Sequence, residues 1–142
     1  YVQLDWDDYD QMLEAKKETP ASGTTVITDK NGYALAFSKN IIPAIRNYDK
    51  AKENMDESPI KRHIGLYAYS YDTLKEYTSL EKSIYEQNYI EGLEQMRFLY
   101  NALKVKMVKV DYRGRETTSG VDALEDIARV EAIIDKYGEL IS

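Results

Sequence analysis

Two carboxylates lie at the start of an expected helix near the end of the chain, in Gly120-Val121-Asp122 with Glu125 three residues further on. An aspartate at this position accepts hydrogen bonds from the free N–H groups of the first turn, and the glutamate completes a capping box. The same carboxylates also suit a hard cation at a strand-to-helix junction, where α/β enzymes place their chemistry. The local pattern favours the cap. The two interpretations are compatible, because one oxygen of Asp122 can cap while the other faces a cation.

A second group of chemically able side chains surrounds His63, the only histidine. The alternation over residues 63–69 predicts a buried strand with Ile64, Leu66 and Ala68 on one face. His63, Tyr67 and Tyr69 would then share the opposite face. A single histidine is often structural, but polar-tipped rings on one face also suit the wall of a binding pocket. Both interpretations remain open at this point.

The other expected elements must position these groups. The pattern predicts helices over residues 5–18, 89–103 and 122–137 and strands over residues 24–28, 33–38 and 104–112. Helical turns are expected at 71–77 and 83–88, and a charged loop with a short helix is expected at 46–59. Asn31-Gly32 is typical of a hairpin turn. Four aspartates near the start of the first helix favour a solvated acidic face over a metal cluster. The order of elements indicates one α/β domain, residues 1–142, with a mixed β-sheet and flanking helices.

Three residues of the helix expected over 89–103 lie off its apolar stripe: Glu94, Gln95 and Arg97. The simplest interpretation of such residues is that they face solvent.

Composition limits the classes of function. The net charge of −6 argues against a general nucleic-acid binder, and the chain has no cysteine for disulfide or thiolate chemistry. No apolar run approaches the roughly 18 residues needed to span a bilayer, and the acidic start is unlike a signal peptide. We therefore expect a soluble, cytoplasmic protein. The sequence has no GxGxxG, P-loop, nucleophile elbow or HExxH motif. The residues alone indicate a polar small-molecule ligand with a divalent cation.

Four stretches, in this order and spacing, resemble the C-terminal half of the 3-deoxy-manno-octulosonate cytidylyltransferase (CMP-Kdo synthetase) family. They are residues 31–39 (NGYALAFSK) with Ile42-Pro43, residues 62–69 (RHIGLYAY), residues 93–99 (LEQMRFL), and Gly120-Val121-Asp122 with Glu125-Asp126-Ile127. The resemblance extends from about Val26 to Ile134. It implies a Rossmann-like fold of the nucleotide-diphospho-sugar transferase type.

The resemblance also implies a reaction. The family joins CTP to the acidic sugar Kdo, giving CMP-Kdo and pyrophosphate, with Mg²⁺ as cofactor and as a homodimer. Asp122 resembles the second magnesium-binding aspartate of the family. The residues that resemble its sugar contacts are His63, Tyr67, Glu94 and Gln95. Arg46 resembles the arginine that meets the carboxylate of the sugar acid.

The sequence also departs from the family pattern. The phosphate-binding loop and the first magnesium aspartate are not present, and Lys39 stands where the family usually has arginine. We therefore expect residues 1–142 to be the sugar-binding and dimerisation half of such an enzyme, without the N-terminal CTP-binding part and inactive alone. The alternative is a non-catalytic dimerisation or sugar-binding domain that has lost the CTP site.

Overall fold

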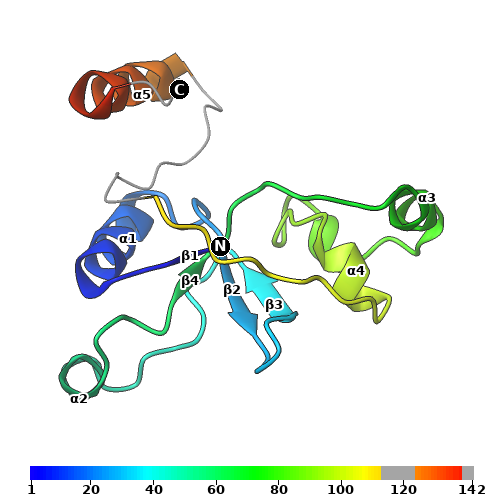
Figure 1. The fold of residues 1–142 in the computed structure, drawn as a ribbon, viewed down its shortest axis with the longest axis horizontal. Helices are drawn as coiled ribbons and strands as arrows, with labels where there is room; N and C mark the ends of the chain where they lie inside the picture. The colour runs from blue at the N-terminus through cyan, green and yellow to red at the C-terminus, as the bar shows by residue number, and fades with distance from the viewer. Residues whose placement is uncertain (113–123, 139–142) are drawn as a thin grey trace. The chain divides into compact units, whose positions relative to one another are not determined.

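The computed structural model describes residues 1–112 and 124–138. They belong to two compact units, Tyr1–Val110 and Asp111–Ser142, which are considered separately. The first unit contains every strand among the described residues (Figure 1). The second contributes the helix α5, Leu124–Tyr137. The junction at Gly120-Val121-Asp122 lies outside the described residues, as do the side chains of Glu125 and Asp126.

The first helix, α1, covers Trp6–Glu18, as the sequence predicts. Asp5 is its N-cap, and the Asp5 carboxylate accepts a hydrogen bond of 2.7 Å from the Asp8 amide. The acidic residues therefore serve the helix terminus. Among the described residues, no group of three or more histidine and carboxylate side chains could hold a metal ion.

The sheet is built around the predicted hairpin. Strand β2, Thr25–Thr28, pairs antiparallel with β3, Ala34–Ser38, and Val26 lies opposite Phe37. The turn is stabilised by the Asp29 carboxylate, which accepts from two backbone amides. Two short strands complete the order β1-β4-β2-β3: β1, Val2–Gln3, and β4, Lys61–Arg62. The α/β class is confirmed, and the pairs among these four strands are antiparallel.

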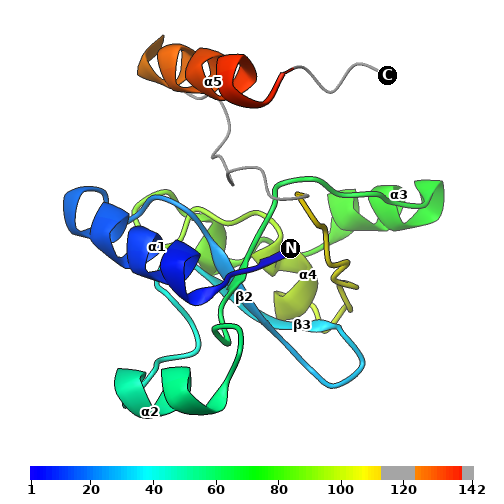
Figure 2. The same cartoon turned by 60° about the vertical axis from the view of Figure 1, so that its left-hand side comes forward.

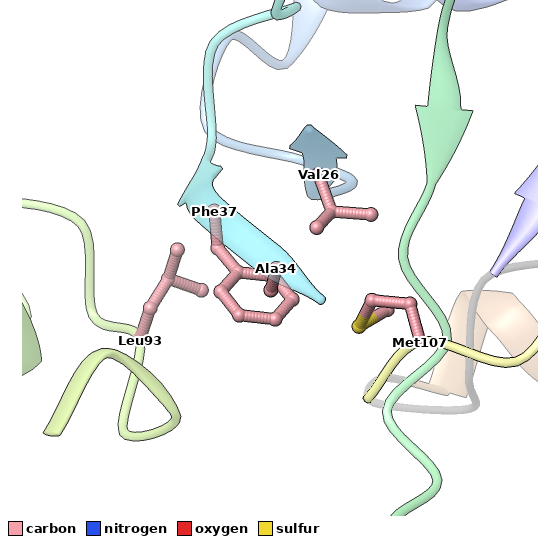
Figure 3. Close-up of a cluster of buried hydrophobic side chains, with 5 residues drawn as sticks. All are labelled: Val26, Ala34, Phe37, Leu93 and Met107. Atoms are coloured by element: carbon pink, nitrogen blue, oxygen red, sulfur yellow. The ribbon is translucent and has the colours of Figure 1, made fainter. Parts of the chain in front are cut away.

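The core of the first unit lies on one face of the hairpin. Figure 3 shows Val26 from β2 and Ala34 and Phe37 from β3 pointing toward one another, with Leu93 and Met107 beside them. All five side chains are buried. Leu93 and Met107 come from much later in the chain, so this cluster attaches the second half of the unit to the hairpin.

The strand predicted over residues 63–69 is wrong. Pairing ends at β4, and the last link to the sheet is a 2.8 Å hydrogen bond from the His63 amide to the Thr24 carbonyl. The aliphatic face expected to be buried is not, since Leu66 is 85% exposed. The segment leaves the sheet, bends at Gly65 and is held by its aromatic side chains.

The long helix predicted over residues 89–103 is also wrong. Only α4, Met96–Tyr100, is α-helical there, preceded by the 3₁₀ turn η1, Ile84–Glu86. Gly92 has φ +60°, a left-handed conformation that interrupts a helix. The apolar residues do recur at helical spacing, but they belong to several turns and one short helix.

The strand predicted over residues 104–112 is wrong as well. Its backbone is extended and makes one isolated bridge, between Tyr33 and Lys106. Two hydrogen bonds support that bridge, from the Ala34 amide to the Val105 carbonyl and from the Met107 amide to the Gly32 carbonyl. This contact fixes Met107 against the hairpin without extending the sheet.

The remaining helices agree with the sequence. Helix α2, Tyr48–Asn54, lies within the charged excursion, and α3, Tyr71–Ser79, extends the helical turns predicted there. Helix α5 ends before Gly138, which has φ +73° and closes the helix by donating to the Ile134 carbonyl. No helix within residues 1–112 and 124–138 combines the length and apolarity that a membrane span requires.

Gly92 gives a direct test of this interrupted helix. We expect Gly92→Ala to lower the free energy of unfolding by about 1–2 kcal/mol, because an L-residue is strained in the left-handed region. Steric contact adds little, since an added Cβ would meet Asn88 at 3.6 Å. Urea denaturation measures the change. Gly65→Ala is the matched control, because nothing lies within 4 Å of its added Cβ. Equal stability of the two variants would contradict this explanation.

Candidate functional site

His63 lies where the chain leaves β4, against the hydrophobic core. Its ring packs edge-on against Phe37, with centroids 5.3 Å apart. His63 Nε2 is 2.6 Å from the Tyr67 hydroxyl oxygen, a hydrogen bond between two residues predicted to lie on the same face. The predicted association of His63 with Tyr67 is therefore confirmed, although no strand produces it. Spacing of four residues in extended chain would separate the two rings, so the segment must bend between them.

Stacked rings hold this segment in place of strand hydrogen bonds. We call the series Tyr67, Tyr69, Phe98 and Tyr77 the ring ladder, with successive centroids 5.8, 5.7 and 4.9 Å apart. The first two pairs are stacked and the third is tilted. Aromatic pairs at these separations attract beyond the area they bury. The ladder joins the His63 segment to α4 and α3.

Gln95 and Glu94 lie at the beginning of α4, close to this ladder. Gln95 is the N-cap residue of α4 and only 4% exposed. The simple interpretation of Gln95 as solvent-facing is therefore wrong, because the helix predicted around it does not exist. Glu94 is exposed, and its backbone carbonyl accepts a hydrogen bond of 3.3 Å from the Tyr77 hydroxyl.

The Gln95 side-chain amide is the unusual feature of this region. Its Nε2 is buried and has no hydrogen-bond partner. A buried, unpaired amide donor costs about 1–3 kcal/mol. Such a group is stabilised by a bound water or by a ligand that supplies an acceptor oxygen.

The electrostatics of the site favour neutral His63 and Tyr67. Burial lowers the pKa of His63 to about 4, the positive charges of the Tyr1 amino group and Lys39 act in the same direction, and the Glu94 carboxylate opposes them. Burial likewise raises the pKa of the Tyr67 hydroxyl, with Tyr69 and Glu94 adding to the effect. At neutral pH the pair is uncharged and can exchange hydrogen bonds with hydroxyl groups.

The pKa of His63 predicts a pH dependence of stability. The folded protein keeps the ring neutral, whereas the unfolded chain takes up a proton below about pH 6.5. The resulting stabilisation is fully present above that pH and is lost as pH falls toward about 4. One proton gives a slope of at most about 1.4 kcal/mol per pH unit.

Urea denaturation between pH 4 and 7 measures this slope. His63→Phe keeps a ring against Phe37 and removes the titrating group, so its stability should depend less steeply on pH than that of the unaltered chain. Parallel curves for the two proteins would contradict the depressed pKa.

Two predicted site residues are not brought to this group. Arg46 is exposed and makes no hydrogen bond or ion pair to any residue that the structure describes. It immediately precedes α2, and α2 lies apart from α4 in both Figure 1 and Figure 2. Asp122 lies outside the described residues. The structure thus unites His63 and Tyr67, with Glu94 and Gln95 nearby.

Two further residues shape the site: Arg97, which the sequence predicts to face solvent, and Glu91, which it does not single out. The prediction for Arg97 is wrong, since its side chain is only 13% exposed. Arg97 packs over the Tyr77 ring at 4.3 Å and donates through Nε and Nη2 to the Glu86 carboxylate. Glu91 accepts from the Ser38 hydroxyl and the Lys39 amide. The high tyrosine content was the available signal for the ladder, since 13 tyrosines accompany only two phenylalanines.

The chemistry of this region suits a polar, hydroxyl-rich ligand. It offers a buried, unpaired amide donor, a neutral histidine–tyrosine pair and an exposed carboxylate. The described residues do not by themselves supply the several carboxylate oxygens that Mg²⁺ prefers. Binding and orientation of a ligand are therefore what this part of the chain can do.

Comparison with known proteins shows the family to which this chain belongs. The family model described as Cytidylyltransferase matches residues 5–107. The chain therefore belongs to the cytidylyltransferase family.

The similar curated relatives carry one particular name. The chain is 44% identical over 131 residues to the 3-deoxy-manno-octulosonate cytidylyltransferase of Maricaulis maris (strain MCS10), covering 92% of this chain and 47% of that protein. It is 41% identical over 111 residues to the enzyme of the same name from Chloroherpeton thalassium (strain ATCC 35110 / GB-78), covering 78% and 40%. The chain thus spans about half the length of the curated relatives it matches, or somewhat less.

A solved structure has the same fold. It is CMP:2-keto-3-deoxy-manno-octonic acid synthetase complexed with CTP, with a TM-score of 0.63 and 26% identity. The match covers 92% of this chain and 56% of that one. The resemblance seen in the sequence is confirmed at the level of family and fold.

Proposed function

We propose that this chain is the part of a cytidylyltransferase that binds a Kdo-type sugar acid and presents it for transfer of CMP from CTP, giving CMP-sugar and pyrophosphate. The observation that carries the proposal is the buried, unpaired Nε2 of Gln95, in the residue that follows Glu94, whose carboxylate acts on the pKa of both His63 and Tyr67. An eight-carbon sugar acid supplies the hydroxyl oxygens that such an amide lacks. The relatives named 3-deoxy-manno-octulosonate cytidylyltransferase support this choice of sugar.

Each residue has a binding role in this proposal. Gln95 donates to a sugar hydroxyl, and the Glu94 carboxylate accepts from another. His63 and Tyr67 exchange hydrogen bonds with the sugar, and their neutral state avoids attracting water and ions into the site. Arg46 is proposed as the partner of the sugar carboxylate, for which a guanidinium is well matched, although the structure does not bring Arg46 to the other four residues. Ordering the sugar in this way lowers the entropic part of the barrier to transfer.

The remaining parts of the proposal concern CTP, Mg²⁺, assembly and location. The solved relative in complex with CTP supports CTP as the second substrate. Asp122 is proposed as one Mg²⁺ ligand, and the bound cation would screen the charge of the triphosphate. A homodimer in the cytoplasm completes the proposal, and the cysteine-free composition is compatible with a reducing compartment.

A specific observation favours a second candidate, a non-catalytic dimerisation or sugar-binding domain that has lost the CTP site. Three large apolar or aromatic side chains of the first unit are unusually exposed: Leu66 at 85%, Tyr71 at 79% and Tyr89 at 84%. Where exposed side chains of this kind form a continuous patch, they are typical of contact surfaces.

Calorimetry with the 142-residue chain separates these candidates. We expect Kdo to bind, and Gln95→Leu to weaken binding by about tenfold, the value of one to two hydrogen bonds. Gln11→Leu, an exposed glutamine on α1, is the matched control and should bind normally. A folded chain that gives no heat with Kdo would refute the proposal. Sugar binding without any binding of CTP and Mg²⁺ would favour the binding domain, and a stable dimer that binds none of them would favour the dimerisation domain.

A further inference from the structure

Tyr77 occupies a central position in the site without belonging to any motif in the sequence. It lies in α3, and its ring is tilted against the Phe98 ring, with the two centroids 4.9 Å apart. The Arg97 guanidinium also packs over the Tyr77 ring, 4.3 Å from its centroid. The Tyr77 hydroxyl donates to the Glu94 carbonyl at 3.3 Å. Tyr77 therefore links α3 both to the turn before α4 and, through Phe98, to the rest of the ring ladder.

The turn that Tyr77 contacts is anchored at its start by Leu93, which is buried in the core and donates to the Tyr85 carbonyl at 3.1 Å, but the helix that follows is short. Helix α4 is only five residues long, Met96–Tyr100, and its N-cap residue Gln95 makes no side-chain capping hydrogen bond. Short helices are marginal without tertiary contacts. The left-handed Gly92 precedes this turn, so the backbone there is not continued from a longer helix. Beyond the anchor at Leu93, contacts from other elements therefore help to set the position of Glu94 and Gln95.

The Arg97–Glu86 ion pair makes Tyr77 a rigid support. Both charged side chains are nearly buried, at 13% and 11% exposure, and Glu86 also accepts from the Ser83 amide at 2.8 Å. Arg97 is thereby held in one orientation over the Tyr77 ring. A guanidinium stacked on an aromatic face and paired with a carboxylate has few alternative positions.

We propose that Tyr77 is a positioning residue for the sugar site: clamped beneath Arg97, it holds the Glu94 carbonyl and so fixes the turn that presents Glu94 and Gln95. The inference rests on the proposed function, because the turn matters for binding only if these residues contact the sugar. Tyr77 does not itself touch the ligand. Its hydroxyl acts through the backbone, and its ring acts through Phe98 and Tyr69 on the segment that carries His63 and Tyr67.

Tyr77→Phe tests this role with little risk to folding, because the ring remains between Arg97 and Phe98. We expect calorimetry to show Kdo binding weakened by about three- to tenfold, the value of one hydrogen bond. The thermal midpoint should change little. Tyr71→Phe is the matched control on the same helix, since its side chain is 79% exposed and its hydroxyl has no partner among the described residues.

Amide hydrogen exchange followed by NMR gives a readout that does not need the sugar. The amides of Arg97 and Phe98 donate to the carbonyls of Glu94 and Gln95, so they report on this turn. Tyr77→Phe should speed their exchange severalfold, whereas Tyr71→Phe should not.

Unchanged exchange in Tyr77→Phe would overturn the positioning role, even if Kdo affinity fell. Faster exchange with unchanged affinity would overturn its link to binding. If the unaltered chain binds no Kdo, the proposed function fails, and exchange alone then decides whether Tyr77 fixes the turn.

Discussion

Phe37→Ala should lower the free energy of unfolding by about 3–5 kcal/mol, the largest effect we expect from one substitution in this protein. The side chain is 3% exposed and lies at the centre of the cluster that joins the hairpin to Leu93 and Met107. Removing the ring leaves a cavity that these neighbours, held by separate segments, cannot collapse to fill. A loss of this size is a large fraction of the 5–15 kcal/mol that stabilises a typical domain.

The same strand provides the control for Phe37. Leu35 lies two positions earlier on β3 and is 60% exposed, so Leu35→Ala removes a similar aliphatic volume from solvent-facing surface. Its cost should be below about 0.5 kcal/mol. Urea denaturation of the two variants measures both values. If they lost equal stability, the core described for the first unit would be incorrect.

Glu86→Ala should have the second largest effect, lowering the free energy of unfolding by about 3 kcal/mol. The substitution leaves the nearly buried Arg97 guanidinium without its carboxylate. It also removes the capping box at η1, because the Glu86 side chain no longer accepts from the Ser83 amide. In the unaltered chain the pKa of the Glu86 carboxyl group lies below its ordinary value, chiefly because Arg97 donates a hydrogen bond to it and also because the Ser83 amide does.

An exposed ion pair supplies the comparison for Glu86. Glu14 and Lys17 on α1 are also in contact, but their side chains are 72% and 68% exposed. Glu14→Ala should therefore cost well under 1 kcal/mol, because solvent screens exposed pairs. Thermal unfolding of both variants gives the comparison. A small loss for Glu86→Ala, similar to that for Glu14→Ala, would show that the buried pair does not hold η1 to α4.

The sequence predicted the elements whose signals are local. The hairpin around Asn31-Gly32 and the helix after Asp5 depend on turn and capping residues that act on their own neighbours, and both are confirmed. The end of α5 at Gly138 is of the same kind. Each of these signals decides the backbone within about one turn, so no knowledge of the tertiary structure was required.

The wrong predictions share a different physical origin. Alternation over residues 63–69 describes side chains, but a strand also needs a neighbour with free backbone groups, and the segment leaves the sheet after His63. Apolar spacing over residues 89–103 suits a helix, but Gly92 adopts a left-handed conformation and divides the segment. Apolar and polar residues alternate over 104–112 too, yet this segment pairs with the edge of the hairpin through a single isolated bridge.

The candidate site was predicted through the family resemblance more than through local patterns. From the residues alone, Gln95 was interpreted as solvent-facing, whereas it is buried with an unpaired amide. His63 and Tyr67 were grouped correctly, since they form a hydrogen bond. The clamp of Tyr77, Arg97 and Glu86 joins three separate elements, and such a contact cannot be read from spacing along one of them.

NMR of the glutamine side-chain amides tests the central claim most directly, that this region binds a Kdo-type sugar acid. The chain has four glutamines, and Gln3 is an internal reference because its amide already donates to the Ser58 and Ile60 carbonyls. We expect Kdo to shift the Gln95 amide resonances as Nε2 gains an acceptor, and to leave those of Gln3 unmoved. We also expect Gln95→Leu to remove the shifting pair of signals. Gln95 resonances that stay in place at saturating Kdo would contradict the claim.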